Sequence, residues 1–370
     1  MHDNGDRRDL RLDACRGLAL WFIFIDHIPA SSLAWLTPRK FGFSDMSEVF
    51  VFVSGYTCML AYGGALRQQG WLTIVTRALR RAWEIYAAFL FLLIAYFVVI
   101  WVVGNGNRFL DETNTRVFFE SPGTALVYAA ILQYTPVNTD ILPTFVLLHL
   151  GFPIVLWLLM RNATAALAIS FLLYLMVQMF GWNLRKWPNG ELYFNPLAWQ
   201  FLFVFGAWYA HDGALRLKTI VQSRALLALA SLYVVISLTI ALSWEIKPLE
   251  ALVPDAISGL IYPIYKSSLA PLRLLHFLAL AILVSRLMPR DWHGLMKPWM
   301  MAMIRCGENS LAIYCIGVLL SFGGFVILSQ FSTTLIMQVV IGIGGIALMI
   351  AAASMMTWTS KHDKPGPKLF

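Results

Sequence analysis

Residues 13–28, DACRGLALWFIFIDHI, place a run of apolar side chains between two pairs of ionisable ones. The predicted membrane span around this run is Arg16–Leu36, with Asp13 before it and Asp26 and His27 within it. On an ideal helix Arg16 and His27 are about 20° apart around the axis and about 16 Å apart along it, so they share one face. Asp13 lies on the same face. Ionisable residues inside a span are functional by default, which makes this helix the first candidate for a site.

The whole chain is strongly apolar. Of its 370 residues, 59% are hydrophobic and only 13% are charged, and the mean hydropathy is +0.68. Soluble domains have about 25% charged residues, and the apolar runs recur too often to leave room for one. We therefore predict an all-α integral membrane protein, one domain over residues 1–370 built as a bundle of about ten transmembrane helices. The predicted spans are Arg16–Leu36, Ser47–Leu66, Trp83–Val103, Pro143–Met160, Ala163–Trp182, Asn195–His211, Ser223–Trp244, Pro271–Leu287, Asn309–Gln330 and Leu335–Trp358.

The stretch Thr124–Tyr134 is apolar but too short to cross a bilayer. Prolines 122, 136 and 143 limit the helices around it. We predict a re-entrant or interfacial helix near residues 124–134, and an eleventh span is the alternative.

The basic residues orient the predicted bundle. Most of the 28 Lys and Arg residues lie in alternate connections, which are predicted to be cytoplasmic because cytoplasmic loops retain an excess of positive charge. Both termini then lie in the cytoplasm, residues 1–15 as an N-terminal segment and residues 361–370 as a tail. The net charge of +8 follows from this bias, so we expect no nucleic-acid partner. The cytoplasmic set includes Arg7, Arg8, Arg11, Arg16, Arg77, Arg80, Arg81, Arg216, Lys218 and Arg305.

Other predicted spans carry polar side chains at a depth similar to that of His27. In the predicted topology they lie in the outer halves of three spans. Glu48 and Ser54 belong to the second span, His149 to the fourth, and Arg273 and His276 to the eighth. Each of these residues also has a purely structural explanation. Glu48 and Arg273 fit a membrane interface, and His149 and His276 fit a packed core. Ser54 with Gly55 fits close helix packing. Their common depth favours one shared site.

Two segments at the beginning of the chain resemble a known family. The run RLDACRGLALWFIFIDHI (11–28) and the run FSDMSEVFVFVSGYTCMLAYG (43–63) are similar to the start of the OpgC family of membrane succinyltransferases, which modify osmoregulated periplasmic glucans. The wider similarity is to the acyltransferase-3 families. Their Arg-x10-His signature matches Arg16 and His27, and their Phe-rich Ser-Gly motif matches Phe50, Phe52, Ser54 and Gly55. The segment Gly307–Tyr314, GENSLAIY, is similar to their late Gly-x-x-Ser-hydrophobic-Tyr motif.

The resemblance implies an enzyme of the bacterial inner membrane, multi-pass, that moves a succinyl group from cytoplasmic succinyl-CoA to hydroxyls of periplasmic glucans. Acyl-CoA is then a co-substrate, and neither a tightly bound cofactor nor a metal is expected. His27 acts as general base, with Asp26 or Glu48 orienting it and a donor such as Ser54 or Asn309 facing the oxyanion. The residues expected to bind acyl-CoA are Arg16, Asp13, Arg80, Arg81, Arg305 and Asn309, and those expected to bind the acyl group or the acceptor are Arg273, His276 and His149.

The predicted outer loops contain aromatic residues that fit either a sugar-binding platform or an interfacial belt: Trp182, Trp187, Tyr193, Tyr262 and Tyr265. Three alternative functions remain open. The fold also suits an O-acetyltransferase of another cell-envelope polysaccharide or a lipid-linked sugar. A proton-coupled transporter would use Asp26, His27 and Glu48 as a relay. A polysaccharide-binding scaffold would need no intramembrane histidine. The sequence leaves the oligomeric state open.

Overall fold

The computed structural model describes residues 9–29, 31–103, 107–250, 258–259, 261–289 and 292–362. Parts of the predicted cytoplasmic segments, 1–8 and 363–370, lie outside the described residues. The contacts divide the chain into two compact units, Met1–Arg39 with Val284–Phe370 and Lys40–Leu283. Helices dominate both units, and the described residues form no strand beyond an isolated bridge between Arg185 and Glu191. The prediction of an all-α protein is confirmed.

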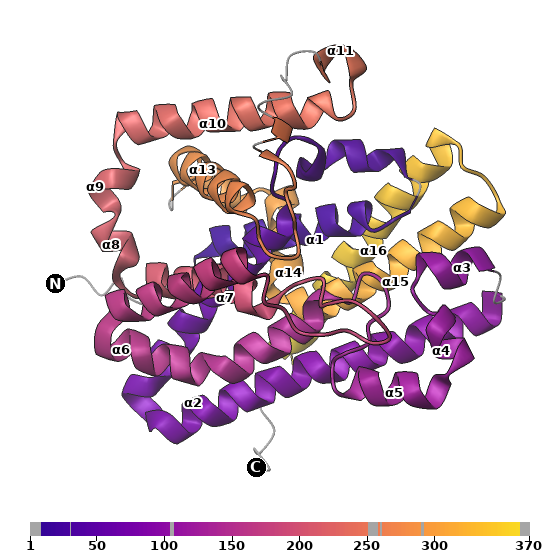
Figure 1. Cartoon of the computed structure of the whole chain (residues 1–370), viewed down its shortest axis with the longest axis horizontal. Helices are drawn as coiled ribbons and strands as arrows, with labels where there is room; N and C mark the ends of the chain where they lie inside the picture. The colour runs from indigo at the N-terminus through magenta and orange to yellow at the C-terminus, as the bar shows by residue number, and fades with distance from the viewer. Residues whose placement is uncertain are drawn as a thin grey trace. The chain divides into compact units, whose positions relative to one another are not determined.

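The first unit consists of α1 and the three last helices, which Figure 1 shows in indigo and in orange to yellow. The Asp9 carboxylate accepts a hydrogen bond from the Arg11 N–H and so caps α1. α1 packs against α14 and α15, and α16 packs against α14 and α15. The elements are α1 (Leu10–Asp26), the short helices η1 (Ser32–Leu36), η2 (Pro38–Lys40) and η4 (His293–Met296), α14 (Pro298–Glu308), α15 (Ser310–Gln330) and α16 (Leu335–His362).

Two glycines bring α1 and α14 close together. A Cβ on Gly17 would lie 1.9 Å from the Met303 carbonyl oxygen, and a Cβ on Gly307 would lie 1.9 Å from the Asp13 carbonyl oxygen. Both distances are far below van der Waals contact, so only glycine fits at these positions. The hydroxyl of Ser321 on α15 donates to the Phe24 carbonyl of α1 over 3.0 Å. α1 is therefore held along its length by its neighbours within the unit.

The second unit has its core where α2, α6 and α7 pack together. α2 approaches α7 closely because Gly55 faces the Phe203 carbonyl and Gly206 faces the Phe52 carbonyl. The elements are α2 (Met46–Val103), α3 (Asn107–Glu112), α4 (Arg116–Glu120), α5 (Pro122–Ala130), α6 (Ile141–Phe180), α7 (Pro196–Trp208), η3 (Tyr209–Gly213), α8 (Ala214–Arg216), α9 (Lys218–Val221), α10 (Arg224–Ser243), α11 (Lys247–Glu250) and α13 (Pro271–Leu287).

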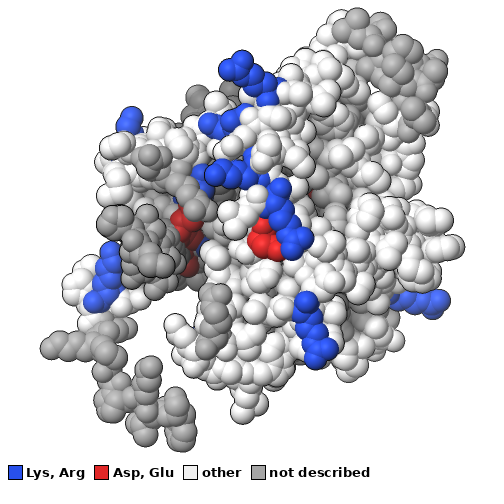
Figure 2. Space-filling view, turned by 90° about the vertical axis from the view of Figure 1, so that its left-hand side faces the viewer, with Lys and Arg blue, Asp and Glu red and all other residues white. Residues whose placement is uncertain are grey.

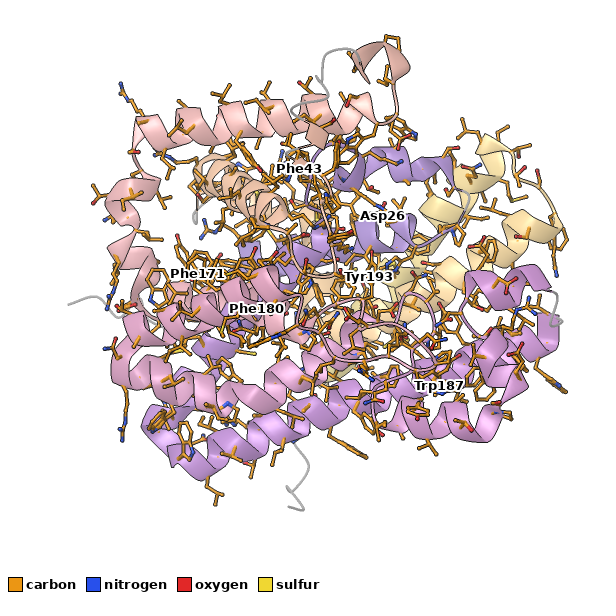
Figure 3. The ribbon with its side chains drawn as sticks, viewed as in Figure 1. Asp26, Phe43, Phe171, Phe180, Trp187 and Tyr193 are labelled. Carbon is orange, nitrogen blue, oxygen red and sulfur yellow. The ribbon has the colours of Figure 1, made fainter. Side chains whose placement is uncertain are left out.

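Six helical segments in the described residues are long and apolar enough to cross a bilayer: Met46–Leu66, Gln68–Val103, Ile141–Phe180, Arg224–Ser243, Ser310–Gln330 and Leu335–His362. Large apolar side chains remain exposed on them, among them Phe171 and Phe180 on α6 (Figure 3), as lipid contact requires. On the face shown in Figure 2, charged side chains form small separate patches on a mainly uncharged surface. The described residues therefore contain six candidate membrane-spanning helices, and the count of about ten stays a prediction.

In the structure, each of two predicted pairs of spans is a pair of helices that meet at a kink. The second and third predicted spans belong to α2, which changes direction at Gly70, where φ is 79°. The fourth and fifth belong to α6, whose only non-helical residue is Asn162 with φ −156° and ψ 96°. Three other predicted spans correspond to shorter helices, namely α1, α7 and α13.

The predicted bounds of the first span are wrong. α1 begins at Leu10 and ends at Asp26, ten residues before Leu36, and a separate 3-10 helix follows at Ser32–Leu36. Pro29 explains the early end, because proline cannot continue a helix and disfavours helical backbone in the residue before it. Near the predicted interfacial helix, the structure contains α5 (Pro122–Ala130), whose nine residues are too few to cross a bilayer.

Candidate active site

The inner end of the predicted reaction path is an ion pair on α1. The carboxylate of Asp13 accepts a hydrogen bond from a terminal nitrogen of Arg16, one helical turn further on. Asp13 is almost completely buried, and the Arg16 side chain is 16% exposed. The Arg16 Nε is buried and has no hydrogen-bond partner in the described part of the chain. Asp13 thus orients the Arg16 guanidinium. The guanidinium keeps N–H donors that Asp13 does not use.

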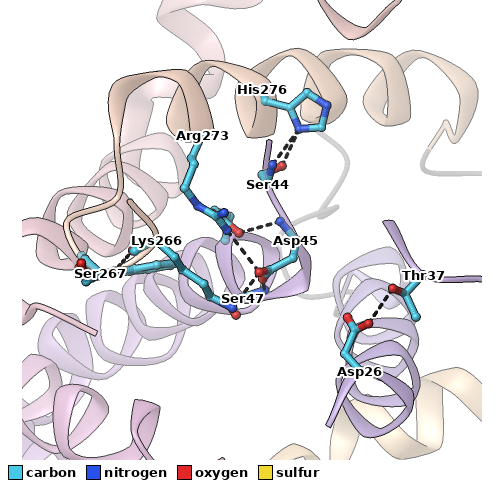
Figure 4. A network of polar contacts seen from close by, with 11 residues as sticks. Asp26, Thr37, Ser44, Asp45, Ser47, Lys266, Ser267, Arg273 and His276 are labelled. Carbon is cyan, nitrogen blue, oxygen red and sulfur yellow. Dashed lines mark hydrogen bonds and ion pairs between the residues drawn. The ribbon is translucent and has the colours of Figure 1, made fainter. Parts of the chain in front are cut away.

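At the other end of α1, Asp26 is the last helical residue and His27 is its C-cap. The His27 backbone N–H donates to the Ile23 carbonyl over 3.0 Å, so helical geometry continues up to the histidine. The hydroxyl of Thr37 donates to Asp26 Oδ1 over 2.6 Å (Figure 4), and Thr37 is completely buried. The carboxylate beside His27 is therefore fixed by a residue that the sequence analysis did not single out. No sequence signal pointed to Thr37, because the contact depends on how the chain folds back after α1.

In the second unit, Glu48 belongs to a network of ion pairs and hydrogen bonds at the start of α2 (Figure 4). Arg273 on α13 donates from Nε to Glu48 Oε1 over 2.8 Å and from a terminal nitrogen to Asp45 Oδ2 over 3.1 Å. Lys266 lies 2.6 Å from the same Asp45 oxygen. The backbone N–H of Asp45 donates to Glu48 Oε2 over 3.0 Å, and the N–H of Ser47 donates to Asp45 Oδ1 over 2.8 Å.

The network balances two buried carboxylates with two cations. Burial alone would raise the pKa of Asp45, but Lys266 and Arg273 outweigh it and hold that pKa well below its ordinary range. Both carboxylates bond to Arg273, whose side chain is only 10% exposed. No sequence pattern assigned Asp45 or Lys266 to this group, although Asp45 lies only three residues before Glu48.

His276, one turn after Arg273 on α13, bonds to the loop that precedes α2. Its Nδ1 accepts from the Ser44 N–H over 3.2 Å and lies 2.7 Å from the Ser44 hydroxyl oxygen. The imidazole fits because residue 42 is glycine, where a Cβ would lie 2.3 Å from two ring atoms. His276 thus ties α13 to the segment that carries Asp45.

His149 and Ser54 both have local partners. The Nδ1 of His149 donates to the Phe145 carbonyl over 2.8 Å, because a carbonyl can only accept, and its Nε2 lies 3.6 Å from the Cys58 sulfur. The Ser54 hydroxyl donates to the Phe50 carbonyl one turn earlier over 2.7 Å. These contacts are typical of packed helices, which is the structural alternative stated for both residues.

The other residues predicted to bind acyl-CoA are Arg80, Arg81, Arg305 and Asn309. Arg80 and Arg81 both bond to Glu84, over 3.2 and 2.9 Å. In the first unit, Arg305 donates to the Ser354 hydroxyl over 3.1 Å. The side-chain amide of Asn309, between α14 and α15, donates to the Arg305 carbonyl and to the Thr357 hydroxyl over 3.0 and 3.1 Å. All four side chains lie at helix surfaces or ends, where a phosphate could approach.

The structure thus brings together two groups of predicted site residues, one in each unit. Arg16 meets Asp13 in the first unit, and Glu48 meets Arg273 in the second. Their union in one active site remains a prediction. In the described residues, no group of three or more His, Cys, Asp or Glu side chains is placed to hold a metal ion.

Comparison with known proteins extends the resemblance seen at the beginning of the sequence. The sequence model of the family described as OpgC protein matches residues 8–361, which is nearly the whole chain. No curated protein and no solved structure is significantly similar to this chain. A match of this length covers both compact units, from the start of α1 to the end of α16. The chain therefore belongs to the OpgC protein family.

Proposed function

We propose that this protein is a membrane O-acyltransferase that moves a succinyl group from cytoplasmic succinyl-CoA to hydroxyls of periplasmic glucans. Membership of the OpgC family suggests a glucan-modifying acyltransferase, and the apolar helices suggest a membrane protein. The observation that carries the proposal is α1, a single helix with a paired arginine near its start and a histidine beside a fixed carboxylate at its end. We further propose about ten spans, both termini in the cytoplasm and a location in the bacterial inner membrane.

Arg16 is proposed to bind a phosphate of acyl-CoA at the cytoplasmic end of α1. Its pairing with Asp13 supports this role, because a held guanidinium loses less entropy when it binds a phosphate. Arg80, Arg81, Arg305 and Asn309 are proposed to add donors for the same nucleotide. Asp13 contributes by orienting Arg16 and does not itself contact the phosphate.

His27 is proposed to take the proton of the acceptor hydroxyl as the oxygen attacks the thioester carbonyl. The new C–O bond forms, the C–S bond breaks, and the proton passes from the imidazolium to the thiolate of CoA. Asp26 stabilises the imidazolium, and its bond to Thr37 supports this role because it fixes the carboxylate. Ser54 could donate to the oxyanion after it releases the Phe50 carbonyl.

Arg273 is the proposed partner of the succinyl carboxylate. Because Arg273 already bonds to Glu48 and Asp45, it would have to exchange one of these bonds. The 3.1 Å bond to Asp45 is the better candidate, since Asp45 keeps Lys266 as a partner. Glu48 then holds Arg273 in place. His276 and His149 are proposed to shape the acyl and acceptor region through their contacts with Ser44 and Cys58.

The test is acyl transfer by the purified protein in nanodiscs, with succinyl-CoA or acetyl-CoA as donor and periplasmic glucan as acceptor, measured by mass spectrometry. We expect succinyl groups to be added, and we expect His27→Ala to lower the rate on the order of 100-fold or more. His211→Ala is the matched control, because His211 is exposed at the end of another helix.

The outcomes separate the alternatives. Transfer from acetyl-CoA alone would assign an O-acetyltransferase. No transfer from either donor would contradict the proposal and favour the transporter. Near-normal turnover by His27→Ala at equal expression would remove the proposed base.

A further inference from the structure

A short non-helical segment, Tyr265–Leu269, is fixed to α6 and α7 through its backbone carbonyls. The Trp199 indole N–H lies within bonding distance of the Lys266 and Ser267 carbonyls, at 3.2 and 3.1 Å. The Asn195 N–H also donates to the Ser267 carbonyl, over 3.1 Å. Gln178 donates to the Ser268 carbonyl over 2.7 Å, and the Tyr174 hydroxyl donates to the Leu269 carbonyl over 2.8 Å. We call this segment the 265–269 strap.

The strap ends in a strained residue. Leu269 has φ of 50°, in the left-handed region that a branched side chain rarely adopts, and its side chain is completely buried. Such a conformation persists only where the surroundings determine the backbone, which is common at functional sites. The hydrogen bonds to the strap carbonyls hold the backbone of Leu269 in this conformation. The strap is therefore a rigid support for the side chains of Tyr265 and Lys266.

The strap presents a partly open cation beside exposed aromatic rings. The Lys266 ammonium bonds to Asp45 and lies 5.2 Å from the centroid of the Phe194 ring. This contact brings the chain neighbours Tyr265 and Tyr193 into one region, and their side chains are 60% and 48% exposed. Tyr193, labelled in Figure 3, packs edge-on against Phe194. An ammonium has three donors, so Lys266 keeps donor capacity beyond Asp45.

Two other aromatic residues of the predicted platform are engaged elsewhere. Trp187 stacks on Tyr128 with ring centroids 5.1 Å apart and planes at 6°, so one of its faces is covered. The Tyr262 hydroxyl is bonded to the Trp244 indole N–H. The structure thus leaves Tyr193 and Tyr265, the rings around Lys266, as platform candidates, together with Trp182, which stacks on Phe180.

The backbone around Lys266 argues against lipid as the occupant of this surface. Residues 262–270 and 181–195 form no regular helix. Irregular backbone does not occur where it would face hydrocarbon, because its polar groups would lack partners. The surface of Tyr193, Tyr265 and Lys266 therefore faces water or a polar ligand. Aromatic faces beside a hydrogen-bond donor match a pyranose ring, which has apolar C–H faces and hydroxyls around its edge.

We propose that Tyr193, Tyr265 and Lys266 form a binding subsite for one pyranose unit of the polysaccharide acceptor. The two tyrosine rings contact the C–H faces of the sugar, and the Lys266 ammonium donates to its hydroxyls. The subsite rests on the proposed function, since it names where the acceptor of that reaction binds. It adds three residues that bind the acceptor and take no part in the chemistry.

The test combines equilibrium binding of purified periplasmic glucan, measured by saturation-transfer NMR on the full-length protein in nanodiscs, with acyl-transfer kinetics. Tyr193→Ala, Tyr265→Ala and Lys266→Met are each expected to raise the glucan Kd and KM about tenfold, since each removes one good contact. For Tyr193→Ala and Tyr265→Ala, the kcat at saturating glucan and the KM for acyl-CoA should not change. Lys266→Met is assessed by glucan binding alone, because Lys266 is also the partner that Asp45 keeps when Arg273 binds the succinyl group.

Two control variants separate a sugar subsite from an interfacial belt and from a general charge effect. Trp101→Ala removes an aromatic ring that is 80% exposed on α2. Lys186→Met removes a lysine that pairs with Asp140 over 2.8 Å and is as shielded as Lys266. Both controls should bind glucan as the unchanged protein does.

Each possible result decides a different point. Glucan binding by the three subsite variants that equals that of the unchanged protein would overturn the subsite and leave the proposed function intact. Equal losses in the variants and the controls would also overturn it. If the unchanged protein transfers no acyl group to glucan and does not bind it, the proposed acceptor fails together with the subsite.

Discussion

Arg273 lies between two carboxylates that are almost completely buried. Glu48 has no exposed surface, and Asp45 is 9% exposed. Burying an ion costs several kcal/mol, which its partners must offset. Arg273 bonds to both acids, whereas Lys266 bonds only to Asp45. Glu48 therefore depends on Arg273, and the two residues should be tested as a unit.

We predict that Arg273→Met destabilises the protein by about 3–5 kcal/mol, because it leaves the Glu48 charge buried without its cation. The melting temperature in detergent, followed by tryptophan fluorescence, measures the effect. The double variant Arg273→Met with Glu48→Met should recover much of the loss, since it removes both charges. Arg116→Met is the control, because its partner Asp111 is exposed. A loss for Arg273→Met no greater than that of the control would contradict the prediction.

The sequence identified Glu48, Arg273 and His27 as ionisable residues in apolar surroundings. It did not show that Glu48 meets Arg273, because the partners are far apart in the chain and no local pattern links them. Thr37 and Lys266 had no distinguishing signal at all, since a hydroxyl and a lysine in a loop are ordinary residues. Only the folded chain makes them the partners of Asp26 and Asp45.

At the scale of single elements, α1 is the helix that positions the proposed chemistry. It lies against α14 through the facing glycines Gly17 and Gly307, so the two backbones touch. This contact sets the position of Asp13 directly, because the Asp13 carbonyl faces Gly307. The hydropathy of the sequence predicted a helix here but with the wrong bounds, and the glycine next to Arg16 gave no hint of which helix it would contact.

We predict that Gly17→Ala displaces α1 from α14, because the added Cβ would lie 1.9 Å from a carbonyl oxygen that cannot move independently of its helix. The expected destabilisation is about 1–3 kcal/mol, as for overpacking of a core. It should appear as a lower melting temperature together with weaker acyl-CoA binding by isothermal titration. Gly344→Ala on α16 is the control, because a Cβ there meets no atom within 4 Å. Equal melting temperatures for both variants would show that α1 and α14 pack differently.

At the scale of the whole molecule, the chain forms two compact units, and the first joins the two ends of the sequence. The α1 helix from the start of the chain packs with α14 and α15 from its end. The family match covers both units, so the proposed function belongs to the complete chain. The direction in which the chain crosses the membrane is the global property that the charge pattern predicts.

We predict that the loop of residues 183–194 faces the periplasm and that residues 217–222 face the cytoplasm. In a background without the four native cysteines, Asn189→Cys should react with a membrane-impermeant maleimide in cells whose outer membrane alone has been opened. Thr219→Cys should react only after the inner membrane is also permeabilised. Both positions are exposed, so access to the reagent decides the result. The reverse pattern would invert the proposed orientation and place His27 toward the wrong compartment.

The sequence alone was enough to predict a helical protein with many apolar spans, because a helix satisfies its own backbone hydrogen bonds and needs only apolar side chains around it. It therefore predicted Pro271–Leu287 exactly as α13 occurs and the start of α2 to within one residue. The end of α1 was also encoded locally, in Pro29, although hydropathy obscured it. Which polar groups meet depends on the folded chain, as in the Arg273 and Lys266 network and in the bond from Thr37 to Asp26. The two Arg273 contacts join residues 225 and 228 positions apart, and the Thr37 bond requires the chain to fold back after α1.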